Sequence, residues 1–484
     1  MRLRDIIRNI TPREVVGSTD IEISALSYDS RTINRGDCFF AVEGVAVDGH
    51  RFITSAIERG AVAVVCHRLP ETISERVTYI VVEDSQLAMG FIASAFYGEP
   101  SRELQLVGVT GTNGKTTTAT LLYDLFRMAG YESGLISTVV YRIGVEQIES
   151  THTTPDAIRL NEMMRRMVDS GCRYCFMEVS SHSIAQHRIA GLNFAGAIFS
   201  NITHEHLDYH KTFAEYIRVK KSLFDSLPKG AFALTNIDDR NGEVMVQNTR
   251  AKVYTMSLRS GADFRCKVIE MLLDGMLLRF GNDEVWVKFL GRFNASNLLA
   301  VFGAATLLGL ERGELLRMMS ALNSVAGRFE YTRAEDGTTA IVDYAHTPDA
   351  LENVIQTIEE IRTPSQQLIV LCGCGGDRDR TKRPEMARIA ARYASISIFT
   401  SDNPRHEPAE AILDEMEQGV TSADRYLKIV DRGEAIKTAV MLAKAGDIIL
   451  IAGKGHETYQ IVGDQKHHFD DREQVAAAFA QRKK

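Results

Sequence analysis

The octapeptide TGTNGKTT at residues 110–117 has the composition of a phosphate-binding loop. It follows the apolar run 104–109 and precedes a stretch of helical periodicity, so we predict a glycine-rich loop between a strand and a helix. Backbone N–H groups and the helix dipole favour an anion at such a junction. The ammonium of Lys115 would reach the β- and γ-phosphates, and the hydroxyl of Thr116 would bind Mg²⁺. The loop departs from the usual spacing, because Val109 stands where a glycine is expected.

The nucleotide site expected from this loop consists of Gly111, Thr112, Asn113, Gly114, Lys115, Thr116 and Thr117.

Glu178 ends the strand-like run CFMEV, and a carboxylate buried there without a partner would be costly. We therefore predict that it binds Mg²⁺; the alternative is an ordinary charge at a strand end. The stretch HEHLDYH at residues 204–210 adds three histidines and two carboxylates. Such a cluster could hold zinc, but Mg²⁺ beside phosphate oxygens accepts few protein ligands. We expect one of these histidines to bind metal.

The stretch TSDNPRHEP at residues 400–408 places an arginine directly after an Asn-Pro pair. Pro404 fixes its own φ and restricts Asn403, so the chain leaves the preceding strand in a defined direction. We expect Arg405 in the first turn of a helix, where the dipole favours anions rather than cations. Arginine is well suited to hold a carboxylate by two parallel hydrogen bonds. The alternative is a surface charge.

These motifs need elements to position them, and the chain is long enough for several domains. With 484 residues, 45% of them hydrophobic, we expect three. The fold class predicted is α/β, with a small N-terminal α/β domain at residues 1–100. A central P-loop domain with a mostly parallel sheet would span 101–327, and a C-terminal Rossmann-like, doubly wound domain 328–484.

The C-terminal third is the most regular part of the sequence. Five strand-like runs alternate with helical ones, at residues 339–344, 367–373, 396–401, 426–430 and 447–453. Polar loops follow four of them, as expected of a parallel sheet that binds ligands at the carboxyl ends of its strands. In the central domain, residues 275–280 and 284–289 predict an antiparallel hairpin.

Charge and composition narrow the classes of partner. The net charge is −7, and no long basic run suits a nucleic acid. No signal peptide and no apolar stretch of about 18 residues is present, so we expect a soluble, cytoplasmic protein without a membrane partner. Of the seven cysteines, the pair Cys172 and Cys175 could form a redox or zinc half-site, but its sequence context favours a buried strand.

Seven motifs together resemble the Mur ligases, ATP-dependent enzymes of peptidoglycan precursor synthesis that form amides. In chain order they are TGTNGKTTT, MEVSSHSIAQHRIAG, NITHEHLDYHKTFAEYIRVKKSLF, DYAHTPDAL, GCGGDRDRTKRP, DNPR and AGKGHE. The resemblance as a whole runs from about residue 27, where SYDSR begins, to the C-terminus. The match is best to members that join meso-2,6-diaminopimelate to UDP-N-acetylmuramoyl-L-alanyl-D-glutamate. The resemblance implies that ATP phosphorylates the γ-carboxyl of D-Glu and that an amine attacks the acyl phosphate.

The resemblance also implies roles for individual residues. His206 would join Thr116 and Glu178 as a Mg²⁺ ligand, although His204-Glu205 replaces the Arg-Asp of many members. Lys220 would carry a carbamate, complete the metal site and act in catalysis with Lys115, Glu178 and His206. The ATP site would be completed by Asn294, Asp343 and His346. The UDP-muramoyl-dipeptide would contact Ser30, Thr153, Thr154, Ser180, Gln186 and Arg188.

The N-terminal domain would thus bind UDP, the central domain ATP, and the C-terminal domain the amino acid. The diaminopimelate site would comprise Arg378, Asp402, Asn403, Pro404, Arg405, Gly453 and Glu457. Cofactors would be ATP and Mg²⁺, the partners small-molecule substrates, and the chain a monomer whose C-terminal domain swings about Gly327. Rival functions are the lysine-adding Mur ligase, a folylpolyglutamate synthetase, or a regulatory nucleotide-binding module.

Overall fold

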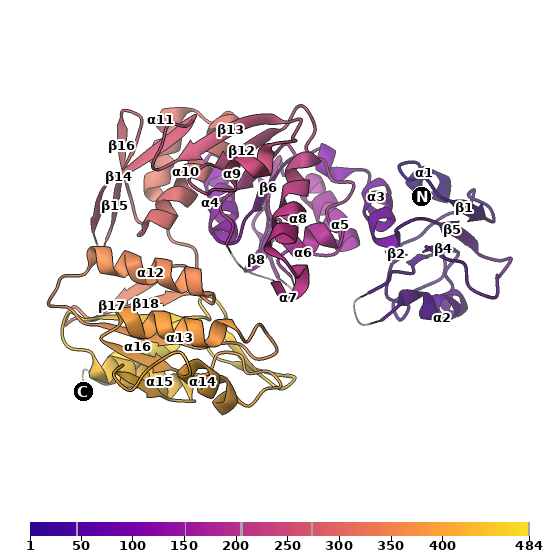
Figure 1. The fold of residues 1–484 in the computed structure, drawn as a ribbon. Helices are drawn as coiled ribbons and strands as arrows, with labels where there is room; N and C mark the ends of the chain where they lie inside the picture. Colours follow the sequence, from indigo (N-terminus) through magenta and orange to yellow (C-terminus); the bar gives the residue numbers. More distant parts are fainter. Residues whose placement is uncertain (45–46, 151, 204–206, 273, 483–484) are drawn as a thin grey trace. The chain divides into compact units, whose positions relative to one another are not determined.

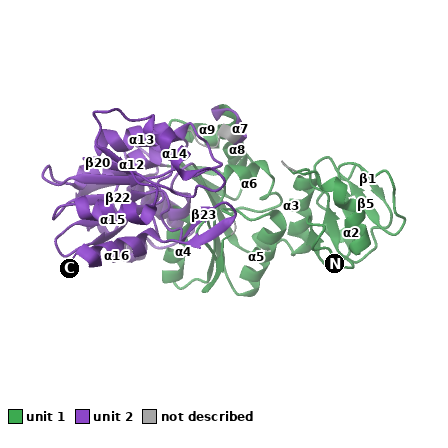
Figure 2. Ribbon diagram, turned by 90° about the horizontal axis from the view of Figure 1, so that it is seen from below, with its two compact units in different colours: residues 1–111, 118–200, 214–255 green, residues 112–117, 201–213, 256–484 purple. Residues whose placement is uncertain are grey.

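The structure is a computed structural model that describes residues 1–44, 47–150, 152–203, 207–272 and 274–482. Within them lie sheets of five, eleven and six strands and a separate two-stranded hairpin (Figure 1). The chain divides into two compact units (Figure 2). The first unit holds residues 1–111, 118–200 and 214–255, and the second holds 112–117, 201–213 and 256–484. In the described chain, no helix combines the length and apolarity needed to cross a membrane.

The five-stranded sheet lies near the N-terminus, in the order β1-β5-β4-β3-β2. The strand-like runs expected there are confirmed as β3 (Cys38–Phe40), β4 (Ala63–Cys66) and β5 (Thr78–Val81), which pair in parallel. All their residues are buried, because apolar side chains pack on both faces. The edges are β2 (Leu26–Ser27), parallel to β3, and β1 (Glu14–Val16), antiparallel to β5.

Helices pack on both faces of this sheet. The core on one face includes residues of α1 (Leu3–Ile6) and α3 (Ser85–Phe96), and the core on the other includes residues of α2 (Ile53–Arg59). Helix α3 begins at Ser85 because the carboxylate of Asp84 accepts hydrogen bonds from two of its first N–H groups.

The central sheet of the first unit is built around β6 (Gln105–Thr110). Its parallel neighbours are β10 (Tyr174–Glu178) and β11 (Gly196–Phe199), followed by β12 (Phe232–Asn236) and β7 (Ser133–Ile136). Cys172 and Cys175 are buried free thiols, which agrees with the buried strand expected there.

An antiparallel meander extends this sheet beyond β7. It consists of β8 (Val140–Ile143) and β9 (Glu146–Glu149). Helix α4 (Lys115–Met128) follows the phosphate loop directly, as the sequence predicts, and the chain turns at Gly130, where φ is +85°. The remaining helices of this part are α5 (Ala157–Asp169), α6 (Ser181–Ala185), α8 (Phe213–Asp225) and α9 (Gly242–Val246).

The largest segment of the second unit begins at Met256, near the end of β13 (Lys252–Ser257). Strands β14 (Phe264–Leu272), β15 (Gly275–Phe280) and β16 (Asp283–Val287) then form an antiparallel meander, which confirms the predicted hairpin. Two helices follow, α10 (Arg292–Leu307) and α11 (Arg312–Ala321). Helix α10 is buried along most of its length, because most of its residues are apolar.

The six-stranded sheet has the order β17-β18-β22-β19-β20-β21. The five predicted strands are confirmed and run parallel, as β18 (Thr339–Asp343), β19 (Leu368–Cys372), β20 (Ile396–Phe399), β21 (Tyr426–Lys428) and β22 (Ile448–Ala452). The sequence analysis missed β17 (Glu330–Arg333), an antiparallel edge strand, and the hairpin of β23 (Tyr459–Val462) and β24 (Gln465–His468).

Helices cover both faces of this sheet, which makes the fold doubly wound as predicted. On one face lie α12 (Pro348–Ile361), α13 (Lys382–Tyr393) and α14 (Ala409–Glu417), whose apolar residues share a core with alternate residues of β19. On the other lie α15 (Arg432–Leu442) and α16 (Asp471–Arg482). The polar loops that follow the strands therefore meet at one edge.

Candidate active site

Asn201 holds the phosphate loop of the second unit in place. Its carbonyl accepts the N–H of Thr112 at 2.8 Å, and its side-chain oxygen accepts the N–H of Asn113 at 2.9 Å. Lys115, the first residue of α4, donates from Nζ to the carbonyl of Thr112 at 2.7 Å. Because the first N–H groups of a helix have no partner inside it, this end of α4 can receive an anion.

Gly114 occupies a position in the phosphate loop that has no room for a side chain. Its φ is +86°, and a Cβ there would lie 2.3 Å from Oδ1 of Asn297. Asn297 of α10 donates from Nδ2 to Oδ1 of Asn294 at 3.3 Å, and both side chains are buried. The structure therefore places Asn297, three residues after the predicted Asn294, directly against the loop. The sequence analysis missed Asn297, although the spacing of the two residues puts them on one helix face.

Arg328 is a second residue that the sequence analysis missed. Its Nη2 donates to the hydroxyl of Thr116 at 3.3 Å, and its guanidinium lies 4.7 Å from the ring centroid of Tyr344. Within the described residues its buried Nε has no hydrogen-bond partner. Arg328 thus presents a positive charge beside the hydroxyl predicted to bind metal. The signal available in the sequence was an arginine directly after the proposed hinge, Gly327.

Asp343 ends β18 and is held from two sides. Its Oδ2 accepts the N–H of Phe329 at 2.7 Å, and its Oδ1 accepts the N–H of Ala345 at 2.8 Å. Burial raises the pKa of its carboxyl, although the charge of Arg328 acts in the other direction. His346, directly after Ala345, approaches the carbonyl of Tyr344 with Nδ1 at 2.8 Å. Asp343 and His346 therefore lie within electrostatic range of each other.

In the first unit, Glu178 lies at the end of β10 and is fully buried. Its Oε1 accepts the N–H of Thr138 at 2.6 Å, and its Oε2 accepts the hydroxyl of the same residue at 3.2 Å. That hydroxyl also lies 3.0 Å from the hydroxyl of Thr153, and the hydroxyl of Thr154 donates to the carbonyl of Glu178 at 2.8 Å. Glu178 is thus oriented by a threonine that the sequence did not single out.

The other residues expected to contact the muramoyl dipeptide lie around Thr154. Arg188 donates to the carbonyl of Thr154 at 2.6 Å and to Oε1 of Gln186 at 2.6 Å and 3.0 Å. Ser180 caps α6 by accepting the N–H of Ser183 at 3.1 Å. The structure therefore brings Thr153, Thr154, Ser180, Gln186 and Arg188 together.

Ser30 is buried in the turn after β2. No described hydrogen bond joins it to Thr154 or Arg188. The nearby Tyr28 interacts electrostatically with Arg188. Burial and the negative charge of Asp156 raise the pKa of the Tyr28 phenol, and the positive charge of Arg188 opposes this shift. The segment around Ser30 therefore lies within electrostatic range of the dipeptide residues.

Lys220 of α8 is almost fully buried, and its Nζ donates to the carbonyl of Gly111 at 2.7 Å. The ring centroid of Tyr216 lies 4.8 Å from the same nitrogen. Its side chain thus ends at the beginning of the phosphate loop, in the first unit. His206 and its neighbours His204 and Glu205 lie outside the described residues.

Arg405 has an unusual backbone. Its φ is +52°, and its N–H donates to the carbonyl of Ile461 at 3.1 Å, while its own carbonyl accepts the N–H of Gly463 at 2.7 Å. The expectation of a helical first turn is therefore wrong, because the β23–β24 hairpin pairs with this residue and α14 begins only at Ala409. The side chain donates from Nη1 to the carbonyl of Gly376 at 2.8 Å.

Further predicted residues meet Arg405 at this edge of the sheet. A Cβ at Gly375 would lie 2.9 Å from Nη1 of Arg405 and 3.7 Å from Cγ of Arg378. A Cβ at Gly453 would lie 2.7 Å from Oδ2 of Asp402. Asn403 donates from Nδ2 to Oε2 of Glu457 at 2.8 Å. The residues expected to bind the amino acid are thus assembled around the ends of β20 and β22.

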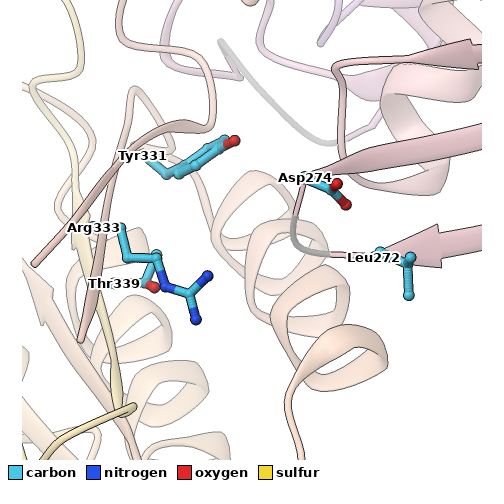
Figure 3. A pocket seen from close by; sticks show the side chains of 5 residues that line it. All are labelled: Leu272, Asp274, Tyr331, Arg333 and Thr339. Atoms are coloured by element: carbon cyan, nitrogen blue, oxygen red, sulfur yellow. The ribbon is translucent and has the colours of Figure 1, made fainter. Parts of the chain in front are cut away.

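Two cavities of the described chain lie away from these residues. Figure 3 shows one of about 330 Å³ in the second unit, where Tyr331, Arg333 and Thr339 of the β17–β18 region face Leu272 and Asp274. Another, of about 380 Å³, lies in the first unit between residues 17–22 and 75–78. Neither cavity contains a predicted site residue. Across the described chain, no cluster of three or more histidine, cysteine or acidic residues is arranged to hold a metal.

Family models match most of the chain. The Mur ligase middle domain covers residues 109–305, and the Mur ligase glutamate ligase domain covers 327–455. The model described as "Mur ligase family, catalytic domain" covers residues 22–97.

The chain belongs to the Mur ligase family.

Curated relatives of this Mur ligase align over nearly their full length. UDP-N-acetylmuramoyl-L-alanyl-D-glutamate--2,6-diaminopimelate ligase of Phocaeicola vulgatus is 56% identical and covers 99% of this chain and 100% of its own. The protein of the same name from Geobacter metallireducens is 42% identical, with 99% and 98% covered.

Solved structures confirm the fold of the Mur ligase. A structure of UDP-N-acetylmuramoyl-L-alanyl-D-glutamate--2,6-diaminopimelate ligase has a TM-score of 0.71 at 32% identity, covering 100% of this chain and 99% of its own. Folylpolyglutamate synthase of Mycobacterium tuberculosis has a TM-score of 0.60 at 17% identity, covering 76% of this chain and 92% of its own. The latter likeness shows a shared fold only.

Proposed function

We propose that this Mur ligase uses ATP to join meso-2,6-diaminopimelate to UDP-N-acetylmuramoyl-L-alanyl-D-glutamate. The observation that carries the proposal is the full-length identity of 56% with a relative named for the ligation of 2,6-diaminopimelate. The loops around Arg405 support it, because they gather two arginines and a carboxylate that suit an amino acid with a second carboxylate.

In the proposed reaction, the γ-carboxylate of D-Glu attacks the γ-phosphorus of ATP, which yields an acyl phosphate and ADP. The amine of diaminopimelate then attacks the acyl carbon to form the C–N bond, and the tetrahedral intermediate expels phosphate and loses a proton from nitrogen to give the amide. The protein contributes mainly positioning and neutralisation of charge. Lys115 and Arg328, which both lie beside the phosphate loop, would receive the negative charge of the transferred phosphoryl group.

Two of the predicted metal ligands offer oxygen donors of the kind that suits Mg²⁺. Thr116 offers a buried hydroxyl, and Glu178 offers a buried carboxylate that Thr138 holds in one orientation. These two residues, with His206, would hold Mg²⁺, which when bound neutralises phosphate charge. We further propose that Lys220 carries a carbamate. A carbamate keeps one N–H for the carbonyl of Gly111 and adds two oxygens that suit a second Mg²⁺.

Each of the three domains expected from the sequence is assigned one substrate. We assign binding of the UDP moiety to residues 1–100, of ATP to 101–327, and of the amino acid to 328–484. The placement of Tyr28 near Arg188 supports the first assignment, since it links the segment at Ser30 to the dipeptide residues.

Release of ADP tests the proposal. Purified protein should release ADP only when ATP, the dipeptide precursor and the amino acid are all present, and meso-2,6-diaminopimelate should be preferred over lysine in an amino-acid panel. A regulatory nucleotidase would release ADP without the precursor. Equal turnover of lysine, or turnover of a folate in place of the precursor, would contradict the assignment.

A further inference from the structure

Lys454 is a buried cation for which the proposed reaction gives no role. It follows Gly453 after β22, and its side chain is 0% exposed. Because a buried ammonium is costly unless it is paired, its partners define its role. Nζ donates to Oδ1 of Asn403 at 3.2 Å and to Oε2 of Glu457 at 3.0 Å. Both partners belong to the proposed amino-acid site.

Glu457 is held on one side only. Its Oε2 accepts hydrogen bonds from Lys454 and from Nδ2 of Asn403, the latter at 2.8 Å. No hydrogen bond from a described residue reaches Oε1, and 13% of the side chain is exposed. Since an ionised carboxylate accepts up to about four hydrogen bonds, Glu457 retains capacity for a substrate ammonium.

Asn403 links Lys454 to strand β23 by hydrogen bonds. Its Oδ1 accepts the N–H of Ile461 at 2.9 Å as well as Nζ of Lys454. Ile461 in turn accepts the N–H of Arg405. Lys454 therefore connects Glu457 to the strand that fixes the backbone of Arg405.

We propose that Lys454 is a positioning residue that sets the preference for diaminopimelate by cancelling the charge of Glu457. This inference rests on the proposed function. At neutral pH the distal end of diaminopimelate has an ammonium and a carboxylate, with net charge zero, whereas the distal end of lysine is a single cation. A positive charge beneath Glu457 therefore disfavours lysine relative to diaminopimelate.

The test compares three amino acids that differ at the distal end. 2-Aminopimelate lacks the distal amino group and is negative there, diaminopimelate is neutral, and lysine is positive. In Lys454→Met, kcat/KM for lysine relative to diaminopimelate should rise about tenfold, and that for 2-aminopimelate should fall about tenfold. Lys454→Arg, which keeps the charge, should retain the wild-type ratios.

A matched control is Arg482→Met. Arg482 also pairs with a carboxylate, that of Asp336 at 3.0 Å, and donates to the carbonyl of Ala443 at 2.7 Å in the same unit. Its loss should lower the melting temperature and leave the amino-acid ratios unchanged. Wild-type ratios in Lys454→Met would overturn the role of Lys454.

The two proposals fail in different ways. If the wild-type enzyme uses lysine as well as diaminopimelate, the proposed function itself fails. If the wild type selects diaminopimelate and Lys454→Met does so equally, only the role of Lys454 fails. Should Lys454→Met not fold, the wild-type enzyme still tests the role of Lys454. Its kcat/KM should be higher for 2-aminopimelate than for lysine. The reverse order would contradict the inference.

Discussion

At the scale of single residues, Arg405 shows how the proposed amino-acid site is held. A positive φ costs a residue other than glycine about 1–2 kcal/mol, and such conformations persist only where the surroundings enforce them. Here two backbone hydrogen bonds with β23 and its turn enforce it. As a result the guanidinium lies at the carbonyl of Gly376, beside Arg378, instead of extending from a helix.

Arg405→Ala should lower kcat/KM for diaminopimelate by about 30-fold to several thousand-fold, because a carboxylate would lose its bidentate partner in a partly buried site. Binding of ATP, measured by calorimetry, should stay unchanged. Arg388→Ala is the control, since among the described residues that exposed arginine of α13 pairs only with Glu385 of its own helix. An Arg405→Ala enzyme with the wild-type preference for diaminopimelate over lysine would contradict the role of Arg405.

Lys220→Ala should reduce turnover by about 10- to 100-fold, because the loss of a metal-holding group affects activity on that scale. Short-chain carboxylates added to the assay should restore part of it by supplying the missing oxygens. Mass analysis of the active enzyme should detect the added carbon dioxide. Lys221→Ala is the control, because Lys221 pairs with Asp225 at 2.6 Å on the same helix. Failure of rescue together with an unmodified amine would disprove the carbamate.

At the scale of elements, the site depends on how closely loops approach one another. Gly327 precedes β17, and its carbonyl accepts the N–H of Tyr344 at 3.0 Å. Its φ is +65°, and a Cβ there would lie 2.0 Å from the nitrogen of His456 and 2.3 Å from the carbonyl carbon of Gly455. The segment before the last sheet is therefore packed directly on the loop that follows β22.

Gly327→Ala should destabilise the protein by more than about 1 kcal/mol, because both the backbone angle and the available space reject a side chain. Urea unfolding monitored by circular dichroism would measure the loss. Gly261→Ala is the control, since no atom lies within 4 Å of a Cβ at that position. Equal urea midpoints for the two variants would show that the loops accommodate a side chain at residue 327 without loss of stability.

His456 predicts a dependence of stability on pH. Burial and the positive charge of Arg328 lower the pKa of its imidazole to about 3, well below its ordinary value of 6.5. Below pH 6.5 the unfolded chain therefore binds a proton that the folded chain does not. Stability from this residue is complete above that pH and falls as pH drops toward 3, by about 1.4 kcal/mol per unit.

Urea unfolding at about pH 7 and about pH 5 should show a smaller acid-induced loss in His456→Phe than in the wild type. His467→Phe, at an exposed position of β24, should behave as the wild type. Identical losses in all three proteins would rule out His456 as the source.

At the scale of the whole molecule, the proposed chemistry needs residues from separate sheets. The predicted phosphate loop follows β6, whereas the loops proposed to bind the amino acid follow β20 and β22. An acyl phosphate reacts with water, so it has to be enclosed while the amine attacks, and closure of domains around substrate is a common solution. We expect the C-terminal domain to move about Gly327 during this step.

Small-angle scattering should therefore report a smaller radius of gyration when an ATP analogue and the dipeptide precursor are both added. Lys115→Ala, which removes an expected phosphate contact, should not contract. Superimposable curves with and without these ligands would count against closure.

The local pattern of the sequence determined much of this protein. The strand, loop and helix from residue 105 to 128, the five parallel strands of the last sheet and the hairpin at residues 275–287 were predictable, because periodicity and glycine placement act over a few residues. Roles for residues inside compact motifs, such as Lys115 and Asp402, were proposed from their neighbours in the chain, and these roles stay predictions.

Only the tertiary structure decided which distant residues support the site. Asn297 and Arg328 meet the phosphate loop across about 180 and 210 positions of sequence, and Lys454 meets Asn403 across 51. The conformation of Arg405 depends on a hairpin more than 50 residues later in the chain. Such contacts arise from packing and hydrogen bonding between loops, so local periodicity contains no signal for them.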